Sequence, residues 1–176
     1  MPEISLQEQV NTLSGETTQL CYHCHKCTAG CPVAYAMERG PDRILRMVQL
    51  DQHAVLSSPD IWLCAGCETC GARCPNAIDI AHVMDALRQV ARAEGIPPAV
   101  PHVALFHEIF LRIVLATGEM HEASLLGGYK LLSGDLFSDL GAGARLMIRG
   151  KVPIVPKLSR NRARVRRVFG ADKDGK

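Results

Sequence analysis

The sequence predicts an all-α protein, and three observations lead to this prediction. Apolar residues recur at helical spacing along most of the chain, glycine and proline stand where these stretches begin and end, and no period-two alternation occurs near the cysteines. With 176 residues, 47% of them hydrophobic, the chain can bury one ordinary core and carry an extension. We expect an N-terminal lead over 1–20, a compact helical domain over 21–96, a helical extension over 97–150 and a basic tail over 151–176.

The first predicted helix begins at Pro41. Proline suits the first helical position because its fixed φ is already helical and no partner is needed for an amide hydrogen there, and Gly40 precedes it. Ile44, Leu45 and Val48 then share one face of the helix. We expect that face to be buried.

The second predicted helix begins after Asp79, whose side chain can cap the first turn. Its apolar stripe is wide and comprises Ile80, Val83, Met84, Leu87, Val90 and Ala91. Gly95, followed by Pro97 and Pro98, ends the helix. The segment 96–101 holds three prolines in six residues and is therefore predicted to be a linker.

Three shorter helical patterns follow the linker. The first has its apolar residues at helical spacing, namely Val103, Phe106, Phe110, Ile113 and Val114. The second covers about 123–132, and the third covers about 135–149 and ends at Gly150. Such helices can form a small core of their own, but three modest helices have little to bury against. We expect part of this apolar surface to meet another protein.

All eight cysteines stand in two runs with identical spacing, and the second run lies 43 residues after the first. Each run reads CxxCxxCxxxCP, the ligand pattern of 4Fe4S clusters, in which the fourth cysteine usually binds the cluster of the other run. We therefore expect two 4Fe4S clusters. The expected ligands are Cys21, Cys24, Cys27 and Cys74 for cluster one, and Cys64, Cys67, Cys70 and Cys31 for cluster two.

Zinc and disulfides are the alternatives for these cysteines. Zinc is held by four thiolates, commonly as two CxxC pairs, and needs neither the third link nor the proline that ends each run. Disulfides are disfavoured because eight cysteines in 176 residues are sparse for a stapled scaffold and no secretory signal precedes them. His23 and His25 lie between the expected ligands, but four cysteines already satisfy each cluster, so we expect neither histidine to bind iron.

The chain is not expected to be an integral membrane protein. Its most apolar stretch, 103–117, is interrupted by His107, Glu108 and Arg112, so it does not reach the roughly 20 apolar residues that span a bilayer. The acidic N-terminal segment does not resemble a signal or transit peptide. Together with the free thiolates, this predicts a reducing, cytoplasmic location.

The C-terminal end is strongly basic. Residues 145–176 carry eleven Lys and Arg against two Asp, whereas residues 1–144 carry nine against sixteen acids. Such an end can dock on an acidic partner or stay solvated and partly disordered. Nucleic acid is disfavoured because Phe169 alone interleaves with the arginines as an aromatic for base stacking. We expect docking on a partner protein of the same complex.

No substrate chemistry is predicted apart from the clusters. The chain has no Walker loop, GxGxxG, GxSxG or HExxH motif, and no cysteine remains as a nucleophile, so no catalytic residue is expected. The chain is expected to pass single electrons between other subunits. Lys26 lies beside cluster one and Arg73 precedes one of its ligands, while Glu68 lies in the loop of cluster two. These charges predict the higher potential at cluster one, with electrons moving there from cluster two.

The run from Cys21 to Pro32, its helical setting and the basic ending that includes 147–151 resemble the small iron-sulfur subunits of the soluble heterodisulfide reductases. Members of that family have a helical ferredoxin domain with two 4Fe4S clusters. The resemblance implies one component of an oxidoreductase complex, which relays electrons from a flavin-containing subunit to a disulfide-reducing subunit. Hydrogenase, formate or other donor modules can supply these electrons. His25 stands where glycine is usual in the family.

Two other functions stay open at this point. The cluster motif is shared with other respiratory iron-sulfur subunits, so it specifies the scaffold more than the substrate. The first alternative is therefore the electron relay of a sulfur-oxidising or quinone-linked heterodisulfide-reductase-like complex. The second is a zinc-stabilised interaction module with a basic, nucleic-acid-binding tail. Iron and zinc contents distinguish these classes.

Overall fold

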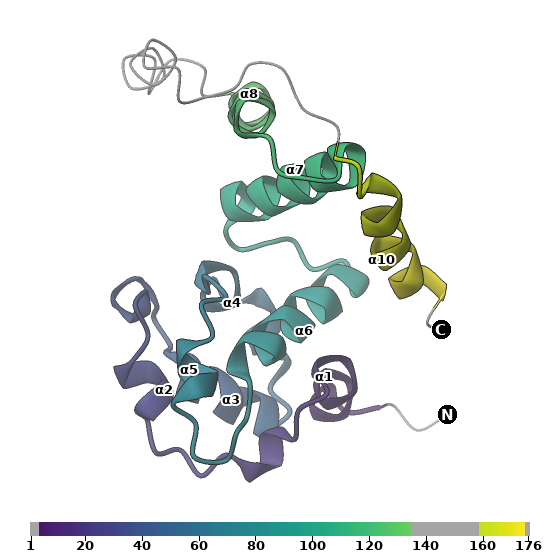
Figure 1. The fold of residues 1–176 in the computed structure, drawn as a ribbon. Coiled ribbons are helices and arrows are strands. Elements are labelled where there is room, and N and C mark those ends of the chain that lie inside the picture. Colours follow the sequence, from purple (N-terminus) through teal and green to yellow (C-terminus); the bar gives the residue numbers. More distant parts are fainter. Residues whose placement is uncertain (1–3, 135–158, 175–176) are drawn as a thin grey trace. The chain divides into compact units, whose positions relative to one another are not determined.

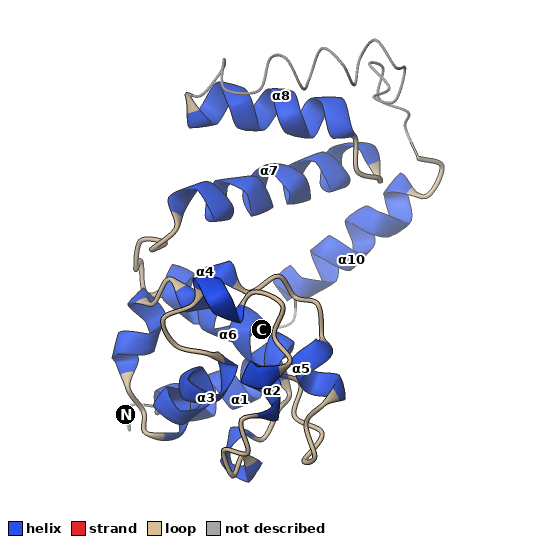
Figure 2. Cartoon of the chain, turned by 90° about the vertical axis from the view of Figure 1, so that its left-hand side faces the viewer, coloured by secondary structure: helices blue, strands red, loops and turns tan. Residues whose placement is uncertain are grey.

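The computed structural model describes residues 4–134 and 159–174 (Figure 1). Over these residues every regular element is a helix, which confirms the all-α class (Figure 2). The chain forms two compact units, Met1–Pro101 and His102–Lys176. The helices are α1 (Leu6–Ser14), η1 (Thr18–Leu20), α2 (Lys26–Ala29), η2 (Ala34–Ala36), α3 (Pro41–Gln49), η3 (His53–Ser57), α4 (Asp60–Leu63), α5 (Thr69–Ala72), α6 (Ile80–Ala93), α7 (Pro101–Thr117), α8 (Glu122–Ser133) and α10 (Arg162–Asp174).

Helix α1 lies within the expected N-terminal lead and belongs to the core of the first unit. Ser5 caps it, because the Ser5 hydroxyl accepts the Glu8 amide at 3.2 Å, and Gly15 ends it in the left-handed conformation with φ 72°. Leu6 and Val10 are fully buried, and the helix packs against α6. The packed structure therefore begins well before the first cysteine.

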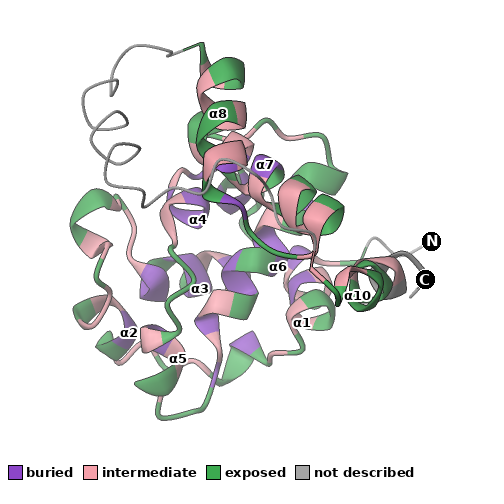
Figure 3. Ribbon diagram, turned by 45° about the horizontal axis from the view of Figure 1, so that its top comes forward, coloured by how far each residue is buried: buried purple, intermediate pink, exposed green. Residues whose placement is uncertain are grey.

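Helices α3 and α6 confirm the two helices predicted between and after the cysteine runs. Pro41 is the first residue of α3, and the predicted face of that helix is buried. Asp79 caps α6 by accepting the amides of Ala81 and His82 at 2.9 and 3.4 Å. Gly95 follows the helix with φ 70°. The whole predicted stripe of α6 is buried, and Figure 3 shows these buried segments on both helices.

The core of the first unit gathers around α6, which packs against α1, α4, α5 and η3. Ile61 and Trp62 of α4 are buried there. The guanidinium carbon of Arg92 lies 5.4 Å from the centre of the Trp62 ring, a cation–π distance. A single long helix thus supports the short segments that carry the cysteines.

The second unit contains α7, α8 and α10. Helix α7 begins at Pro101, the last residue of the predicted linker, and α8 confirms the predicted helix over 123–132. The ring of Phe106 meets that of Tyr129 edge-on at 6.0 Å, which joins the two helices. The predicted helix over 135–149 lies outside the described residues. No helix among the described residues is long and apolar enough to cross a bilayer.

Helix α10 is not predicted from the sequence, which assigns its segment to the basic tail. The amide of Ser159 donates to the Thr117 carbonyl at 2.9 Å, and Nε of Arg166 donates to the Leu115 carbonyl at 3.3 Å. A Cβ at Gly118, which has φ 85°, would lie 2.9 Å from the Arg162 Cα. Glycine therefore permits α10 to approach the end of α7 closely.

Candidate iron-sulfur site

The eight cysteines line two pockets in the first unit. The first pocket is lined by Cys21, Cys24, Cys27 and Cys74. The second pocket is lined by Cys64, Cys67, Cys70 and Cys31. Each pocket thus combines three cysteines of one run with the last cysteine of the other, and these are the two sets that the spacing led us to expect. The packing of α2 against α5 brings the two runs together.

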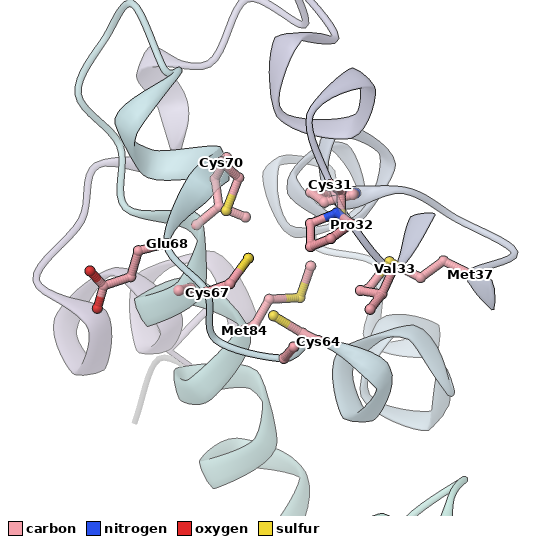
Figure 4. A pocket seen from close by; sticks show the side chains of 13 residues that line it. Cys31, Pro32, Val33, Met37, Cys64, Cys67, Glu68, Cys70 and Met84 are labelled. Atoms are coloured by element: carbon pink, nitrogen blue, oxygen red, sulfur yellow. The ribbon is translucent and has the colours of Figure 1, made fainter. Parts of the chain in front are cut away.

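Apolar side chains line the second pocket together with its cysteines. Cys64, Cys67 and Cys70 turn their sulfur atoms toward a common space, with Cys31 and Pro32 across it (Figure 4). Other lining residues come from the loop after Pro32 and from α6, and they include Val33, Met37, Ile80 and Met84. Such a lining limits solvent access to whatever the thiols bind, which is one of the factors that set the potential of an iron-sulfur cluster.

The arrangement of donors fits a group larger than one metal ion. Among residues 4–134 and 159–174, no three side chains of His, Cys, Asp or Glu converge on a site suited to a single ion. A tetrahedral zinc requires four such donors around one point. A 4Fe4S cluster instead takes one thiolate at each of four separate irons, so its ligands stand farther apart. The four cysteines that line each pocket match the number of thiolates that a 4Fe4S cluster requires.

The loops between the cysteines share an unusual backbone conformation. In the first run, His23 and His25 have φ 58° and 61°. In the second run, Gly66 and Glu68 have φ 61° and 58° at the corresponding positions. His25 and Glu68 are each followed by the first residue of a helix, and a left-handed residue next to a right-handed one turns successive amide hydrogens toward one point, a geometry that binds anionic groups, including iron-sulfur clusters. It also explains why a glycine suits the position of His25.

Asp42, in the first turn of α3, supports the loop of the first pocket. Its carboxylate accepts the Thr28 hydroxyl and lies 2.8 Å from Nδ1 of His25, while its own amide donates to the Thr28 hydroxyl at 3.2 Å. Burial acts to raise the pKa of this carboxyl, but the hydrogen bonds from Thr28 and then His25 outweigh it, so the pKa lies below its usual value. The contact with His25 gives that histidine a structural partner.

Individual cysteine thiols in the two pockets differ in their pKa. Burial raises the pKa of Cys21 and Cys27, and it raises that of Cys70 to about 11. The pKa of Cys67 is instead lowered by the hydrogen bond with the Thr69 hydroxyl, 3.5 Å away. Because iron binds thiolates, loading these pockets must release protons from the buried thiols.

Sequence comparison finds a match to a known domain within the first unit. Residues 20–79, which contain all eight cysteines, match the 4Fe-4S dicluster domain. The match ends at Asp79, the residue that caps α6, so the whole of α6 and the whole second unit lie beyond it.

The chain is also similar to one component of a larger enzyme. It is 34% identical over 103 residues to an iron-sulfur subunit of the CoB–CoM heterodisulfide reductase of Methanocaldococcus jannaschii. The match covers 58% of this chain and 52% of that relative, so the chain spans about half the length of the relative it matches. This similarity confirms the resemblance to the iron-sulfur subunits of heterodisulfide reductases. The chain is thus similar, over part of its length, to an iron-sulfur subunit of a heterodisulfide reductase.

Proposed function

We propose that the chain is the electron-transfer subunit of a heterodisulfide-reductase-like complex and that its dicluster domain holds two 4Fe4S clusters. Cluster one is assigned to the first pocket, with Cys21, Cys24, Cys27 and Cys74, and cluster two to the second, with Cys31, Cys64, Cys67 and Cys70. The crossed grouping of the cysteines carries this proposal, because it gives each pocket four thiols from two segments of the chain. When bound, the clusters supply one-electron redox chemistry.

The protein's part in this function is to hold the two sites close together. Helices α2 and α5, which carry Cys27 and Cys70, pack on each other, and α3 and α6 support the loops behind them. No residue is assigned a role in breaking or forming substrate bonds. We therefore place the reduction of a disulfide on another protein of the complex.

The proposed electron donor is a flavin-containing subunit, and the proposed acceptor is a disulfide-reducing subunit, both in the cytoplasm. The similarity to an iron-sulfur subunit of a heterodisulfide reductase supports them. The second unit offers surfaces for such partners, because several leucines of α7 and α8 are exposed, namely Leu111, Leu115, Leu126, Leu131 and Leu132. Its α10 adds the charges of Arg162, Arg164, Arg166 and Arg167.

The first experiment is anaerobic purification of the full chain with quantification of iron, sulfide and zinc. Two clusters correspond to about eight irons and eight sulfides per chain, with a brown colour and an EPR signal after reduction by dithionite. A colourless protein that holds two zinc ions rejects the relay. A Cys24→Ala and Cys67→Ala double variant is the control for adventitious iron, because it removes one thiol from each pocket.

The second experiment identifies the partners by anaerobic affinity purification of the tagged chain from its native cells, followed by mass spectrometry. Recovery of a flavoprotein together with a cysteine-rich protein supports the proposed complex. Recovery of a membrane quinone-reactive protein instead would assign the chain to a different relay. A Leu131→Glu and Leu132→Glu variant is the matched test of the second unit, since both side chains are more than 60% exposed. Loss of partners with unchanged iron content would assign docking to α8.

A further inference from the structure

Gln49 ties the end of α3 to the backbone that leads into the first cysteine run. Its Nε2 donates to the carbonyl of Thr18 at 2.9 Å and to that of Cys21 at 3.0 Å. Cys21 is the first cysteine of its run, and Thr18 stands three residues before it. A neutral amide thus fixes the backbone where the chain enters the first pocket.

Arg88 makes the corresponding bonds at the second cysteine run. Its Nε donates to the carbonyl of Ile61 at 2.6 Å, and a terminal nitrogen donates to that of Cys64 at 2.7 Å. Cys64 is again the first cysteine of its run, and Ile61 stands three residues before it. Arg88 is the ninth residue of α6, as Gln49 is the ninth of α3. The two cysteine runs are therefore held by equivalent side-chain hydrogen bonds to backbone carbonyls. The donor is the neutral amide of Gln49 at the first run and the cationic guanidinium of Arg88 at the second.

The charge of Arg88 lies where water screens it poorly. Only 13% of its side chain is exposed, and a guanidinium stays protonated in proteins. Asp85 approaches it at 3.9 Å, but the Asp85 side chain is 61% exposed, so water screens that carboxylate. The positive charge of Arg88 is thus only partly compensated beside the loop that carries Cys64.

A second pair of equivalent positions differs in charge as well. Asp42, the second residue of α3, lines the first pocket, and 7% of its side chain is exposed. The second residue of α6 is Ala81, which lines the second pocket. The first pocket therefore has a buried carboxylate where the second has a methyl group.

The charges that act against the effects of Arg88 and Asp42 are either exposed to water or compensated by nearby groups. Lys26 lines the first pocket, Arg73 precedes Cys74 in the sequence, and Glu68 lines the second pocket, but all three residues are exposed to water. The carboxylate of Glu68 points away from the cysteine sulfur atoms (Figure 4). Asp79 lies near Cys70 and, like Arg88, does not line the pocket, but its charge is offset by the amides at the start of α6 that it caps. Because screening is weakest for buried charges, we expect Arg88 and Asp42 to dominate.

We propose that Arg88 raises the reduction potential of cluster two and that Asp42 lowers that of cluster one, so that cluster two has the higher potential. This order is the reverse of the one that the exposed loop charges predict. The inference rests on the proposed function, since it requires both pockets to hold clusters. A cluster that accepts one electron gains one negative charge, which a nearby cation stabilises and a nearby anion opposes. An electron supplied by a reduced flavin-containing partner is then expected to rest on cluster two.

The test is a dithionite redox titration of the anaerobically purified full chain, followed by EPR at one fixed pH of about 8.5, above the ordinary range of histidine titration. Arg88→Gln installs the residue found at the equivalent position, and Asp42→Asn removes a charge while keeping the shape of the side chain. If cluster two has the higher potential, Arg88→Gln lowers the higher midpoint and Asp42→Asn raises the lower one. Both variants then narrow the gap between the two midpoints. With the reverse order, both variants widen it.

Three further variants separate charge from structure. Arg88→Lys keeps the charge and is expected to retain most of the wild-type gap, whereas a purely structural role for Arg88 predicts that Lys and Gln act alike. Lys26→Gln and Glu68→Gln are expected to shift the midpoints less than Arg88→Gln does. The proposal is overturned if Arg88→Gln leaves both midpoints unchanged or if either buried-charge variant widens the gap. Should Arg88→Gln lose iron, Asp42→Asn alone decides.

The iron content keeps this test separate from that of the proposed function. A wild-type chain without about eight irons rejects the relay itself. A fully loaded wild-type chain whose midpoints respond to Lys26→Gln and Glu68→Gln but not to Arg88→Gln rejects only the inference about Arg88.

Discussion

The fully buried carboxylate of Asp60 accepts the backbone amide of Glu38 at 2.9 Å. Glu38 belongs to the segment that follows Cys31, whereas Asp60 begins α4, the helix that leads to Cys64. One carboxylate therefore joins the end of the first cysteine run to the start of the second. Cys31 and Cys64 meet in the second pocket, so this contact supports their crossed arrangement.

Replacing Asp60 by alanine is expected to lower the free energy of unfolding by about 3 kcal/mol, because hydrogen bonds to a charged acceptor contribute roughly 1.5–3 kcal/mol each. The lost donors are the Glu38 amide, the Arg39 amide at 3.3 Å and the Ser58 hydroxyl at 2.7 Å. Anaerobic denaturant titration, read by far-UV circular dichroism, measures the change. Asp85→Asn is the exposed control, with an expected effect within about 0.5 kcal/mol. Equal stabilities for Asp60→Ala and Asp85→Asn would contradict this role.

The crossed grouping of cysteines makes a distinctive prediction for the last cysteine of each run. Cys31→Ala is expected to remove the same EPR signal as Cys64→Ala, because both line the second pocket, although Cys31 belongs to the first run. Cys74→Ala is expected to match Cys21→Ala for the same reason. Iron analysis should fall from about eight to about four per chain in each variant. A Cys31→Ala signal that matches Cys21→Ala instead would show that each run binds its own cluster.

Local signals explain why much of this fold can be predicted from the sequence. Pro41 at the first position of α3, Asp79 at the cap of α6 and Gly95 after α6 each act on the neighbouring turn, so their effect needs no knowledge of the rest of the chain. The cysteine spacing likewise predicts which thiols come together, and the two pockets show those groupings.

Other features depend on contacts between distant segments and leave little local signal. Helix α1 is anchored by Leu6 and Val10, which are too few to distinguish a helix from a polar lead. Asp60 accepts hydrogen bonds from backbone amides, and Arg88 donates hydrogen bonds to backbone carbonyls, that lie 21 to 27 residues away. The residues next to Asp60 and Arg88 in the sequence do not indicate these partners. The charge of Lys26 is visible in the sequence, but the exposure that decides its weight is not.

Gly40 is expected to resist substitution although its backbone is extended, with φ −64° and ψ 168°. A Cβ at Gly40 would overlap Cγ2 of Thr28, whose hydroxyl is bound to Asp42. Gly40→Ala must displace this side chain and is expected to cost about 1–3 kcal/mol in the free energy of unfolding, with weakened iron loading of the first pocket. Gly127→Ala in α8 is the control, because a Cβ there meets no atom within 4 Å. That control should be neutral or stabilise the helix by about 0.5–1 kcal/mol.

If Gly40→Ala retains wild-type iron and stability, the packing of Thr28 against Gly40 does not hold the loop of the first pocket. A Gly40→Ala and Thr28→Ala double variant checks the cause further. Removing the threonine side chain removes the clash, so the added cost of Gly40→Ala in that background is expected to be smaller than in the wild type.

Glu68 holds the left-handed conformation, φ 58°, with an exposed side chain. Glycine adopts this conformation without the penalty of roughly 1–2 kcal/mol that a Cβ brings, so Glu68→Gly should be more stable than Glu68→Ala by about 1 kcal/mol. Denaturant midpoints of the loaded protein, read from the cluster absorbance, compare the two variants. His25→Gly is expected to gain less stability than Glu68→Gly. His25 has the same left-handed conformation, φ 61°, but the variant also loses the 2.8 Å contact with Asp42. Since both Glu68 variants remove the same carboxylate, a difference between them reports the backbone alone, and equal midpoints would show that the loop carries no such strain.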